Sequence, residues 1–328
     1  MKQLHSNIVQ IEDLKVYFPV RRKLFGITFG EQQFVKAVDG VTLNIGPGDI
    51  LGLVGESGSG KTTLGKTLAM LIKPTSGEIF FEKWRLDGLE KREIKKVRKE
   101  IQMIFQDPFS SLNPRKTVLA ILGDVLQTHG LDKKYDKTER IEELLALVGL
   151  SSYLIGNYPH ELSGGQRQRV AIARAIAVEP RFIIADETVS SLDLSIQAQI
   201  INLFMDLHEK LQLTILYITH DLKVAKHIST YIAVMYYGRI VEIAPKDELM
   251  RNPLHPYTNA LLKAIPTMDP ENRRSYREQP EIEPPSLIDA PPGCRYIKYC
   301  DKSRPRCHDP QTLVDVNESH RVACNRFI

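Results

Sequence analysis

Short apolar runs and segments of helical length alternate along the first 250 residues of the chain. Unbroken apolar runs such as Ile50–Val54 and Phe182–Ala185 are typical of strands that are buried on both faces of a sheet. The predicted strands are Ile8–Phe18, Val35–Ile45, Ile50–Val54, Glu78–Glu82, Ile101–Phe105, Phe182–Ala185, Thr214–Ile218, Ile232–Tyr236 and Ile240–Ile243. Helices are predicted from Lys61 through Ile72, in a broken region from about Val118 to Ala177, and over Gln197–Leu211 and Leu222–Ile228. Because strands alternate with helices, we expect an α/β layer fold.

The composition changes after Met250, where prolines become frequent and long apolar runs disappear. We therefore place a boundary near this residue, between a domain over 1–250 and a C-terminal extension over 251–328. A Pro-rich linker is predicted at about 266–292. Pro256 suits the first turn of a helix, which we expect over Asn259–Ala264, and this gives the neighbouring His255 a structural role.

Composition and charge exclude several classes of protein. The 328 residues are 42% hydrophobic and 26% charged, as in a soluble globular protein. No apolar run approaches the roughly 20 residues that span a bilayer, and the N-terminus lacks a signal peptide's apolar core, so we expect a cytoplasmic chain. The net charge of +4 does not call for a nucleic-acid partner. The basic run Lys83–Lys99 predicts an amphipathic helix with a solvated basic face.

A glycine-rich loop follows the apolar run Ile50–Val54 and precedes a predicted helix. Its residues fit the pattern G-x-x-x-x-G-K-[ST], in which backbone N–H groups wrap phosphates. Lys61 supplies a positive charge to the outer phosphates, and Thr62 offers an oxygen to Mg²⁺. The residues expected to bind the nucleotide are Gly55, Ser57, Gly58, Ser59, Gly60, Lys61, Thr62 and Thr63.

Two acids stand at the end of the apolar strand Phe182–Ala185. Asp186 is placed to reach Mg²⁺, through a water molecule. Glu187 is one residue further on, where a carboxylate can orient and polarise the attacking water. Beside a phosphate loop, this pair predicts hydrolysis of a nucleotide.

The stretch Leu162–Gln166 predicts a second anion site. Ser163, Gly164 and Gly165 would begin a helix whose free N–H groups and dipole point at one spot. Two phosphate sites with one phosphate loop indicate that the second site serves the nucleotide of a neighbouring subunit.

These motifs, in their order and spacing, resemble the ATPase subunits of ABC transporters. The resemblance covers residue 8 to about 250 and includes Ser191–Asp193, Ile218–Asp221 and the segment around Gln106. It implies an ABC-type P-loop fold with a helical subdomain at about 107–177, ATP and Mg²⁺ as ligands, and a head-to-tail dimer. A soluble ABC ATPase that does not serve transport is the alternative, and the absence of a second phosphate loop and of a heptad repeat weakens it.

The resemblance also implies roles for single residues. His220 would contact the γ-phosphate and steady Glu187, and Gln106 would touch Mg²⁺ and report the nucleotide state to the membrane partner. The partner's ATP would be closed in by Ser163, Gly164, Gly165 and Gln166, with Asp193 at the dimer interface. Phe18 fits best as the aromatic residue that stacks on adenine, with Tyr17 and Phe34 as alternatives.

The chain departs from the family pattern at two positions. Thr188 stands where the family has Pro after the catalytic Glu, and Ser191 stands where the nearest relatives have Ala. Proline would stiffen the turn, so Thr188 loosens Glu187 slightly, and we expect activity to be retained.

The segments Tyr17–Arg22, Leu24–Gln33, Asp193–Gln199 and Asn252–Thr258 resemble the oligopeptide/dipeptide group of ABC ATPases, and its second ATPase type. This implies a distinct paired ATPase, two membrane permease subunits, an extracytoplasmic substrate-binding protein and a place at the cytoplasmic face of the cell membrane. The group imports peptides and related small solutes.

All four cysteines lie in the C-terminal extension, at positions 294, 300, 307 and 324. A reducing cytoplasm disfavours disulfides, and the spacing matches neither a zinc ribbon nor the ferredoxin run. Chemistry alone leaves a metal site and free thiols open. The group resemblance implies a [4Fe–4S] cluster held by Cys294, Cys300, Cys307 and Cys324, with Zn²⁺ as the alternative.

Overall fold

The computed structural model describes residues 7–20, 23–24, 27–28, 32–132, 136–190, 192–264, 287–288 and 290–327. Most of the predicted Pro-rich linker, part of the Leu24–Gln33 stretch and Ser191 lie outside these residues. None of the helices in the described part of the chain is long and apolar enough to cross a membrane.

The main sheet is a layer of eight strands in the order β13-β14-β12-β11-β5-β10-β9-β8. Its parallel part consists of β8 (Ile101–Ile104), β9 (Phe182–Asp186), β10 (Thr214–Thr219), β5 (Ile50–Val54) and β11 (Tyr231–Tyr236). Every residue of β5, β9 and β10 is buried, which explains their unbroken apolar sequences. An antiparallel edge adds β12 (Arg239–Pro245), β13 (Val314–Asp315) and β14 (Arg321–Val322).

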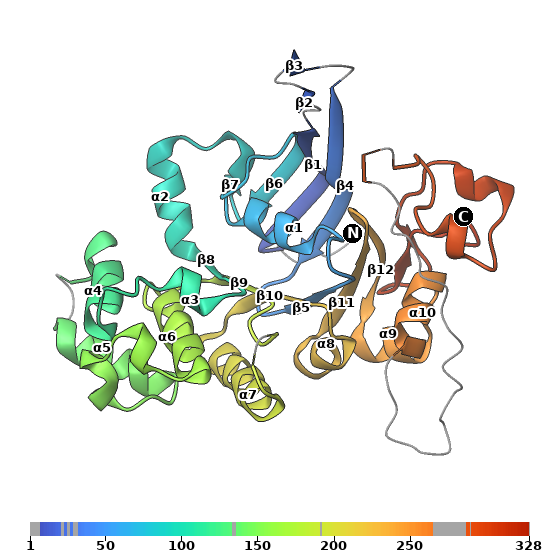
Figure 1. Ribbon diagram of the computed structural model, residues 1–328. Coiled ribbons are helices and arrows are strands. Elements are labelled where there is room, and N and C mark those ends of the chain that lie inside the picture. The colour runs from blue at the N-terminus through green and yellow to red at the C-terminus, as the bar shows by residue number, and fades with distance from the viewer. Residues whose placement is uncertain are drawn as a thin grey trace.

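A second, antiparallel sheet has the order β4-β1-β6-β7 and stands over the main sheet (Figure 1). Its strands are β1 (Val9–Val20), β4 (Gln33–Ile45), β6 (Ser76–Phe81) and β7 (Trp84–Arg85), and β2 (Lys23–Leu24) and β3 (Ile27–Thr28) form a separate pair. Its apolar side chains share one core with Leu64 and Leu68 of α1 (Lys61–Leu68) and with residues of the main sheet. This core fixes α1, and the loop before it, between the two sheets.

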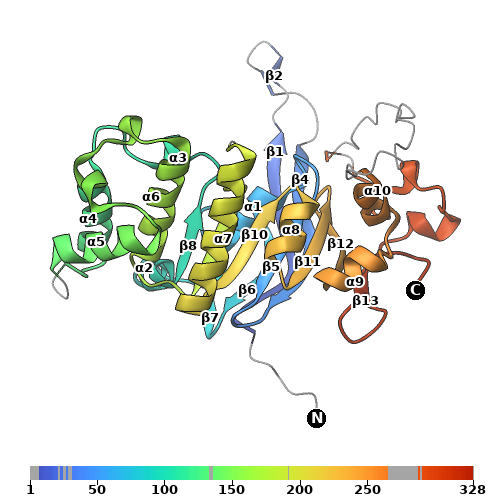
Figure 2. The same cartoon turned by 90° about the horizontal axis from the view of Figure 1, so that it is seen from below.

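A helical lobe lies beyond the β8 edge of the main sheet (Figures 1 and 2). It contains α3 (Pro108–Ser111), α4 (Val118–Thr128), α5 (Lys137–Leu147) and α6 (Gly164–Ile176). Its core of leucines, isoleucines and valines continues under α7 (Leu194–Leu211) to the sheet. Three further helices, α8 (Leu222–Ile228), α9 (Lys246–Arg251) and α10 (Pro256–Ala264), lie near β11 and β12.

The basic segment is only partly helical. Helix α2 covers Lys91–Glu100, whereas Trp84 and Arg85 form β7 and pair with β6. A capping box between Glu90 and Glu93 starts the helix eight residues later than Lys83. The expectation of one helix over Lys83–Lys99 was therefore wrong at its N-terminal end.

The C-terminal extension joins the main sheet, which the sequence did not predict. Val322 of β14 pairs with Glu242 of β12, about 80 positions earlier in the chain. The helix predicted over Asn259–Ala264 is α10, which begins three residues earlier, at Pro256, and ends at Ala264 as predicted. The extension is therefore built onto the antiparallel edge of the sheet that carries the phosphate loop.

Candidate nucleotide site

The phosphate loop connects β5 to α1 at the carboxyl end of the parallel strands. Gly60 caps α1 with φ of 106°, and a Cβ there would lie 2.1 Å from the carbonyl oxygen of Ala37. A Cβ on Gly55 would lie 2.1 Å from the carbonyl oxygen of Met235. Both positions therefore require glycine, the first for its conformation as well as for space.

Lys61 folds back over the loop that it follows. Its Nζ donates hydrogen bonds to the carbonyl oxygens of Gly55, at 2.7 Å, and Glu56, at 2.8 Å. Burial lowers the pKa of Lys61, while the carboxylates of Glu187 and Asp186 act in the opposite direction. A buried ammonium group at the mouth of this loop is suited to bind a phosphate anion, which would take over bonds now made to carbonyls.

The other predicted loop residues divide by position. Ser57 and Gly58 are exposed, whereas Ser59 is buried with Oγ 3.5 Å from Nζ of Lys61. Thr63 lies in the first turn of α1 and is half-buried. The part of the loop at Ser57 and Gly58 is therefore open to solvent.

Thr62 and Asp186 meet across the loop. The hydroxyl of Thr62 donates a hydrogen bond of 3.0 Å to Oδ1 of Asp186. Burial raises the pKa of Asp186, against the hydrogen bond from Thr62, which lowers it. Two oxygen ligands at this separation fit the chemistry of Mg²⁺, which binds few protein oxygens beside phosphate and water.

Side chains that follow the two strands next to β9 contact the carboxylate of Glu187. Nε2 of Gln106, which follows β8, donates a hydrogen bond of 3.0 Å to Oε2 of Glu187, and Nδ1 of His220, which follows β10, lies 3.4 Å from the same oxygen. Glu187 itself adopts φ of 46°, a conformation that is uncommon outside glycine. The strained residue is thus held at the site by the strand ends around it.

The strand order explains why these residues converge. Strands β5, β10, β9 and β8 are consecutive in the sheet, and each carries a predicted site residue just after or at its last residue. The carboxyl ends of parallel strands share one edge, where α/β folds bind ligands. Lys61, Thr62, Gln106, Asp186, Glu187 and His220 therefore form one site.

The residues of the predicted second anion site lie in another layer of the molecule. Ser163 caps α6, where its hydroxyl accepts the N–H of Gln166 at 3.2 Å and Gln166 accepts the N–H of Ser163 in return. Helix α6 belongs to the helical lobe, whereas α1 lies between the two sheets (Figure 1). Gly165 approaches α7 so closely that a Cβ would lie 2.7 Å from Cγ2 of Ile196.

Asp193 caps α7, the helix against which α6 packs. Its Oδ1 accepts the N–H of Ile196 at 3.0 Å, and this hydrogen bond holds the pKa of Asp193 below its usual value. Leu192, which precedes Asp193, lies close to Gly164: a Cβ on Gly164 would lie 3.2 Å from Cδ2 of Leu192. The predicted interface residues of the two segments therefore lie close together on one surface.

The three candidate aromatic residues differ in their freedom to stack on a base. Phe18 and Phe34 are 40% and 39% exposed. Tyr17 is engaged, because its hydroxyl donates to Asp39. Burial alone would raise the pKa of Asp39, but this hydrogen bond and the charges of two arginines lower it. The exposed Phe18 remains better placed than Tyr17.

Thr188, which stands in place of the family's Pro, is buried and bonded. Its hydroxyl donates a hydrogen bond of 3.4 Å to that of Tyr217, and 2% of the residue is exposed. The turn after Glu187 is therefore fixed by a side-chain contact.

The predicted metal site at the four cysteines is not supported. In the described parts of the chain, no three His, Cys, Asp or Glu side chains are arranged to hold a metal ion. All four cysteines are free, and burial raises the pKa of Cys294 to about 11, with a smaller contribution from the other three. Burial also raises the pKa of Cys300 and Cys324, which favours the protonated thiol over the thiolate that binds a metal.

Sequence reasoning missed a polar network that joins the extension to the site. Tyr257 of α10 accepts the N–H of Glu56, and the buried carboxylate of Glu242 accepts the N–H groups of Leu254 and His255. Tyr257 and Glu56 are far apart in sequence, and Leu254 and His255 lie on a loop without a periodic pattern. The local signal in the sequence was a single acid, Glu242, within the apolar run of the predicted strand Ile240–Ile243.

The fold and the site together define an ATP-binding cassette ATPase, an enzyme that hydrolyses ATP. Residues 38–190 match the family described as ABC transporter. The structure is similar to the dimeric post-hydrolysis state of the cassette MJ0796 bound to ADP and Pi, with a TM-score of 0.61 and 29% identity over 73% of this chain and 98% of that one.

More particularly, the chain belongs to the oligopeptide transport ATP-binding proteins. Residues 241–307 match the family described as Oligopeptide/dipeptide transporter, C-terminal region. The chain is 46% identical to the oligopeptide transport ATP-binding protein AppF of Bacillus subtilis, over 98% of each chain. It is 43% identical to OppF of Salmonella typhimurium, over 97% of this chain and 95% of that one.

Proposed function

We propose that this chain is the ATPase subunit that powers import of peptides through a membrane ABC transporter. The observation that carries the proposal is the combination, in one chain, of the nucleotide site with the C-terminal region of residues 241–307. That region is named for oligopeptide and dipeptide transporters, and the relatives AppF and OppF are named for oligopeptide transport.

In this proposal, the residues around Glu187 carry out hydrolysis. Lys61 and the loop N–H groups hold the outer phosphates, and Glu187 accepts the proton of the attacking water. His220 orients Glu187 and contacts the γ-phosphate, while Phe18 stacks on adenine. Thr62, Asp186 and Gln106 would hold Mg²⁺, which neutralises charge on the phosphates.

The completed site would require a second subunit. Ser163, Gly164, Gly165 and Gln166 present the N-terminus of a 13-residue helix, and their anion-binding groups lie in a layer apart from the phosphate loop of the same chain. They would close on the ATP of a paired ATPase, with Asp193 at the interface. The dimeric state of the similar cassette MJ0796 supports this arrangement. We propose a distinct but related ATPase as the partner.

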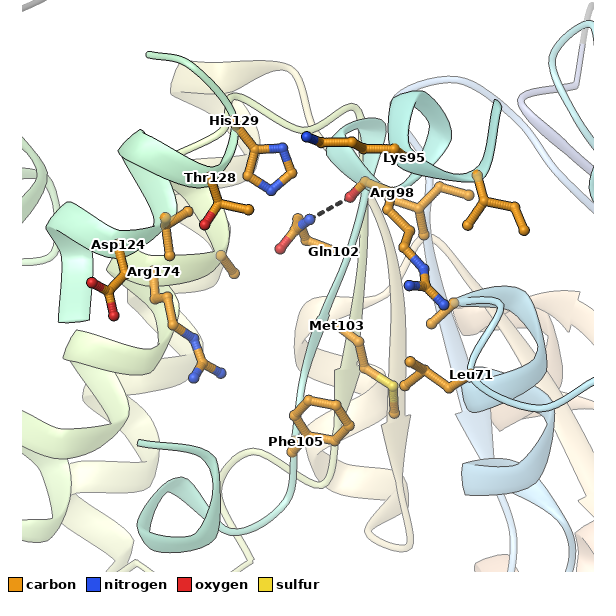
Figure 3. Close-up of a pocket in the computed structure, with 15 residues that line it drawn as sticks. Leu71, Lys95, Arg98, Gln102, Met103, Phe105, Asp124, Thr128, His129 and Arg174 are labelled. Carbon is orange, nitrogen blue, oxygen red and sulfur yellow. Dashed lines mark hydrogen bonds between the residues drawn. The ribbon is translucent and has the colours of Figure 1, made fainter. Parts of the chain in front are cut away.

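A cavity of about 590 Å³ between the sheet and the helical lobe suits the membrane partner (Figure 3). Its lining combines apolar side chains, among them Leu71, Met103 and Phe105, with the basic side chains of Lys95, Arg98 and Arg174. Phe105 directly precedes Gln106, so an occupant of the cavity would press on the residue that is bonded to Glu187. We propose that an apolar helix of a permease subunit binds here and places the chain at the cytoplasmic face of the membrane.

Reconstitution tests the proposal. The chain is co-expressed with a candidate paired ATPase and two candidate permease subunits from the same organism, and the complex is placed in vesicles with the peptide-binding protein. We expect ATP-dependent peptide uptake, and ATP hydrolysis that rises when the loaded binding protein is added. Failure of the chain to co-purify with any permease, together with full ATPase activity alone, would favour a soluble ATPase that does not serve transport.

We also propose that Cys294, Cys300, Cys307 and Cys324 hold a [4Fe–4S] cluster, with Zn²⁺ as the alternative. The support is the family resemblance and the proximity of the thiols, three of which raise the pKa of Cys294. Binding would require their side chains to turn toward a common centre and to lose their protons. Iron, sulfide and zinc assays on the anaerobically purified chain test this: about four iron atoms and a visible absorbance band are expected, and stoichiometric zinc without iron would exclude the cluster in favour of Zn²⁺.

A further inference from the structure

A tyrosine of the C-terminal extension reaches the phosphate loop directly. The hydroxyl of Tyr257, on α10, accepts a hydrogen bond of 3.2 Å from the backbone N–H of Glu56. Glu56 is the second residue of the loop, and 201 positions separate the two residues. Tyr257 belongs to the region of residues 241–307 that matches the oligopeptide/dipeptide transporter C-terminal family, so the contact joins this region to the phosphate loop.

The backbone of Glu56 is held on both sides. Tyr257 accepts its N–H, and Nζ of Lys61 donates to its carbonyl oxygen at 2.8 Å. When a phosphate binds and Lys61 turns toward it, the second of these contacts is weakened. The bond to Tyr257 then remains as a constraint on the start of the loop, beside the 3.2 Å hydrogen bond that the Ser59 N–H donates to the Glu56 carbonyl oxygen.

Tyr257 is rigid enough to serve as such a constraint. It is 2% exposed, and its ring centroid lies 4.3 Å from that of Tyr236 and 5.5 Å from that of Tyr296. Its backbone N–H donates a hydrogen bond of 3.1 Å to Nδ1 of His255. His255 is buried, and burial lowers its pKa to about 4, so the ring stays neutral and Nδ1 can accept.

The start of α10 is in turn fixed to the main sheet. Both carboxylate oxygens of Glu242, on β12, accept backbone N–H groups, that of Leu254 at 2.7 Å and that of His255 at 3.0 Å. The C-terminal segment adds His320, whose Nε2 lies 2.7 Å from Oε1 of Glu242. Glu242 and His320 are both completely buried. Buried hydrogen bonds thus connect the start of α10, and with it Tyr257, to the main sheet.

We propose that Tyr257 is a positioning residue of the phosphate loop, which fixes the Glu56 end of the loop in the shape that binds the phosphates of ATP. The inference rests on the proposed role of Lys61 and its loop as the ATP site. A loop that is already in its binding shape loses less entropy when the nucleotide arrives. Without the tyrosine hydroxyl, the Glu56 N–H lacks this acceptor and the loop becomes free to leave that shape.

The test is nucleotide binding by the full chain, measured by titration calorimetry with Mg-ATP and with Mg-ADP. Tyr257→Phe removes the one hydroxyl and keeps the packed ring. We expect both affinities to fall about fivefold, the range of one net hydrogen bond. The matched control is Tyr296→Phe, which removes a hydroxyl from the same aromatic cluster and leaves the bond between Tyr257 and Glu56 in place; its affinities should equal those of the wild type.

A kinetic measurement separates positioning from a general loss of structure. In the assembled transporter, Tyr257→Phe should raise KM for ATP about fivefold and leave kcat within about twofold. Once the enzyme is saturated with ATP, the bound nucleotide holds the loop in the same shape in the variant and in the wild type. A partly unfolded variant would instead lose kcat in proportion to the inactive fraction, with KM unchanged, and that result would overturn the proposal.

A third variant separates this inference from the proposed site. Lys61→Ala should abolish detectable binding of Mg-ATP. If it does so while Tyr257→Phe binds like the wild type, the positioning role of Tyr257 is wrong and the nucleotide site stands. If Lys61→Ala binds Mg-ATP normally, the proposed site is wrong, and the role of Tyr257 falls with it.

Discussion

Gln106 donates a hydrogen bond of 3.0 Å to the carboxylate of Glu187 and so joins the end of β8 to the end of β9. Phe105, which precedes Gln106, lines the cavity beside the helical lobe. Asp186, which precedes Glu187, accepts the hydrogen bond from Thr62 in the phosphate site. One side-chain contact thus links the proposed permease cavity to the proposed catalytic carboxylate.

The first prediction concerns Glu187 as the general base. Glu187→Gln keeps the shape of the side chain but removes its capacity to accept a proton. We expect the rate of phosphate release to fall by about 10²–10⁴-fold, and the affinity for Mg-ATP to remain within about twofold, because phosphate binding rests on Lys61 and the loop.

The matched control is Glu209→Gln, the same chemical change on the exposed surface of α7. Its rate and affinity should equal those of the wild type. A Glu187→Gln variant that hydrolyses ATP at the normal rate would exclude Glu187 as the base.

The second prediction concerns the shared site at Ser163. Ser163→Arg places a long charged side chain at the N-terminus of α6, where a partner's phosphate would bind. Hydrolysis should fall at least about 100-fold, as when transition-state donors are removed, while ATP binding at Lys61 stays near normal. Binding is measured by calorimetry and hydrolysis in the assembled complex.

Ser163→Ala is the control for the helix cap. The Ser163 hydroxyl accepts the Gln166 N–H, so its loss costs about 1 kcal/mol of stability, without filling the site. A Ser163→Arg variant that lost ATP binding but hydrolysed normally at saturating ATP would contradict the shared-site interpretation.

The third prediction concerns Thr188. Its hydroxyl bonds to Tyr217, so the turn is already fixed, and the wild-type chain should hydrolyse ATP. Thr188→Pro should change the rate of hydrolysis by less than about threefold, and Thr188→Val should cost about 1 kcal/mol of unfolding free energy through the lost hydrogen bond. An inactive wild type that is rescued by Thr188→Pro would show that the turn needs the proline.

The strands that carry the site could be predicted from sequence because their signal is local. Strands β5 and β9 are buried on both faces, which demands apolar residues at every position, and the functional residues follow at once in the chain. The motif at Gly55–Thr62 and the acids Asp186 and Glu187 could thus each be placed at the end of a buried strand from the sequence alone.

The contacts of the extension could not be predicted in this way. Tyr257 meets Glu56 across 201 positions, and β14 is a strand of only two residues. Such contacts leave no periodic pattern in either segment, since a single hydroxyl or a single pair of residues satisfies them. The cysteines show the opposite case: their clustering in sequence is plain, but no metal-binding arrangement accompanies it among the described residues.

The last prediction concerns the pH dependence of stability that His255 introduces. Burial lowers the pKa of His255 to about 4, below the ordinary value near 6.5. The unfolded chain therefore binds the proton more readily, so the contribution of His255 is complete above pH 6.5 and is lost as the pH falls toward 4. Between pH 7 and pH 5, His255 should remove about 2 kcal/mol of unfolding free energy.

His255→Asn tests this, because an amide oxygen can still accept the N–H of Tyr257 but does not titrate. Urea unfolding at both pH values should show that the wild type loses about 2 kcal/mol more than this variant does. His227→Asn, on the exposed face of α8, is the control and should keep the full pH dependence. Equal pH dependence in the wild type and His255→Asn would mean that protonation of His255 does not destabilise the contacts at the start of α10.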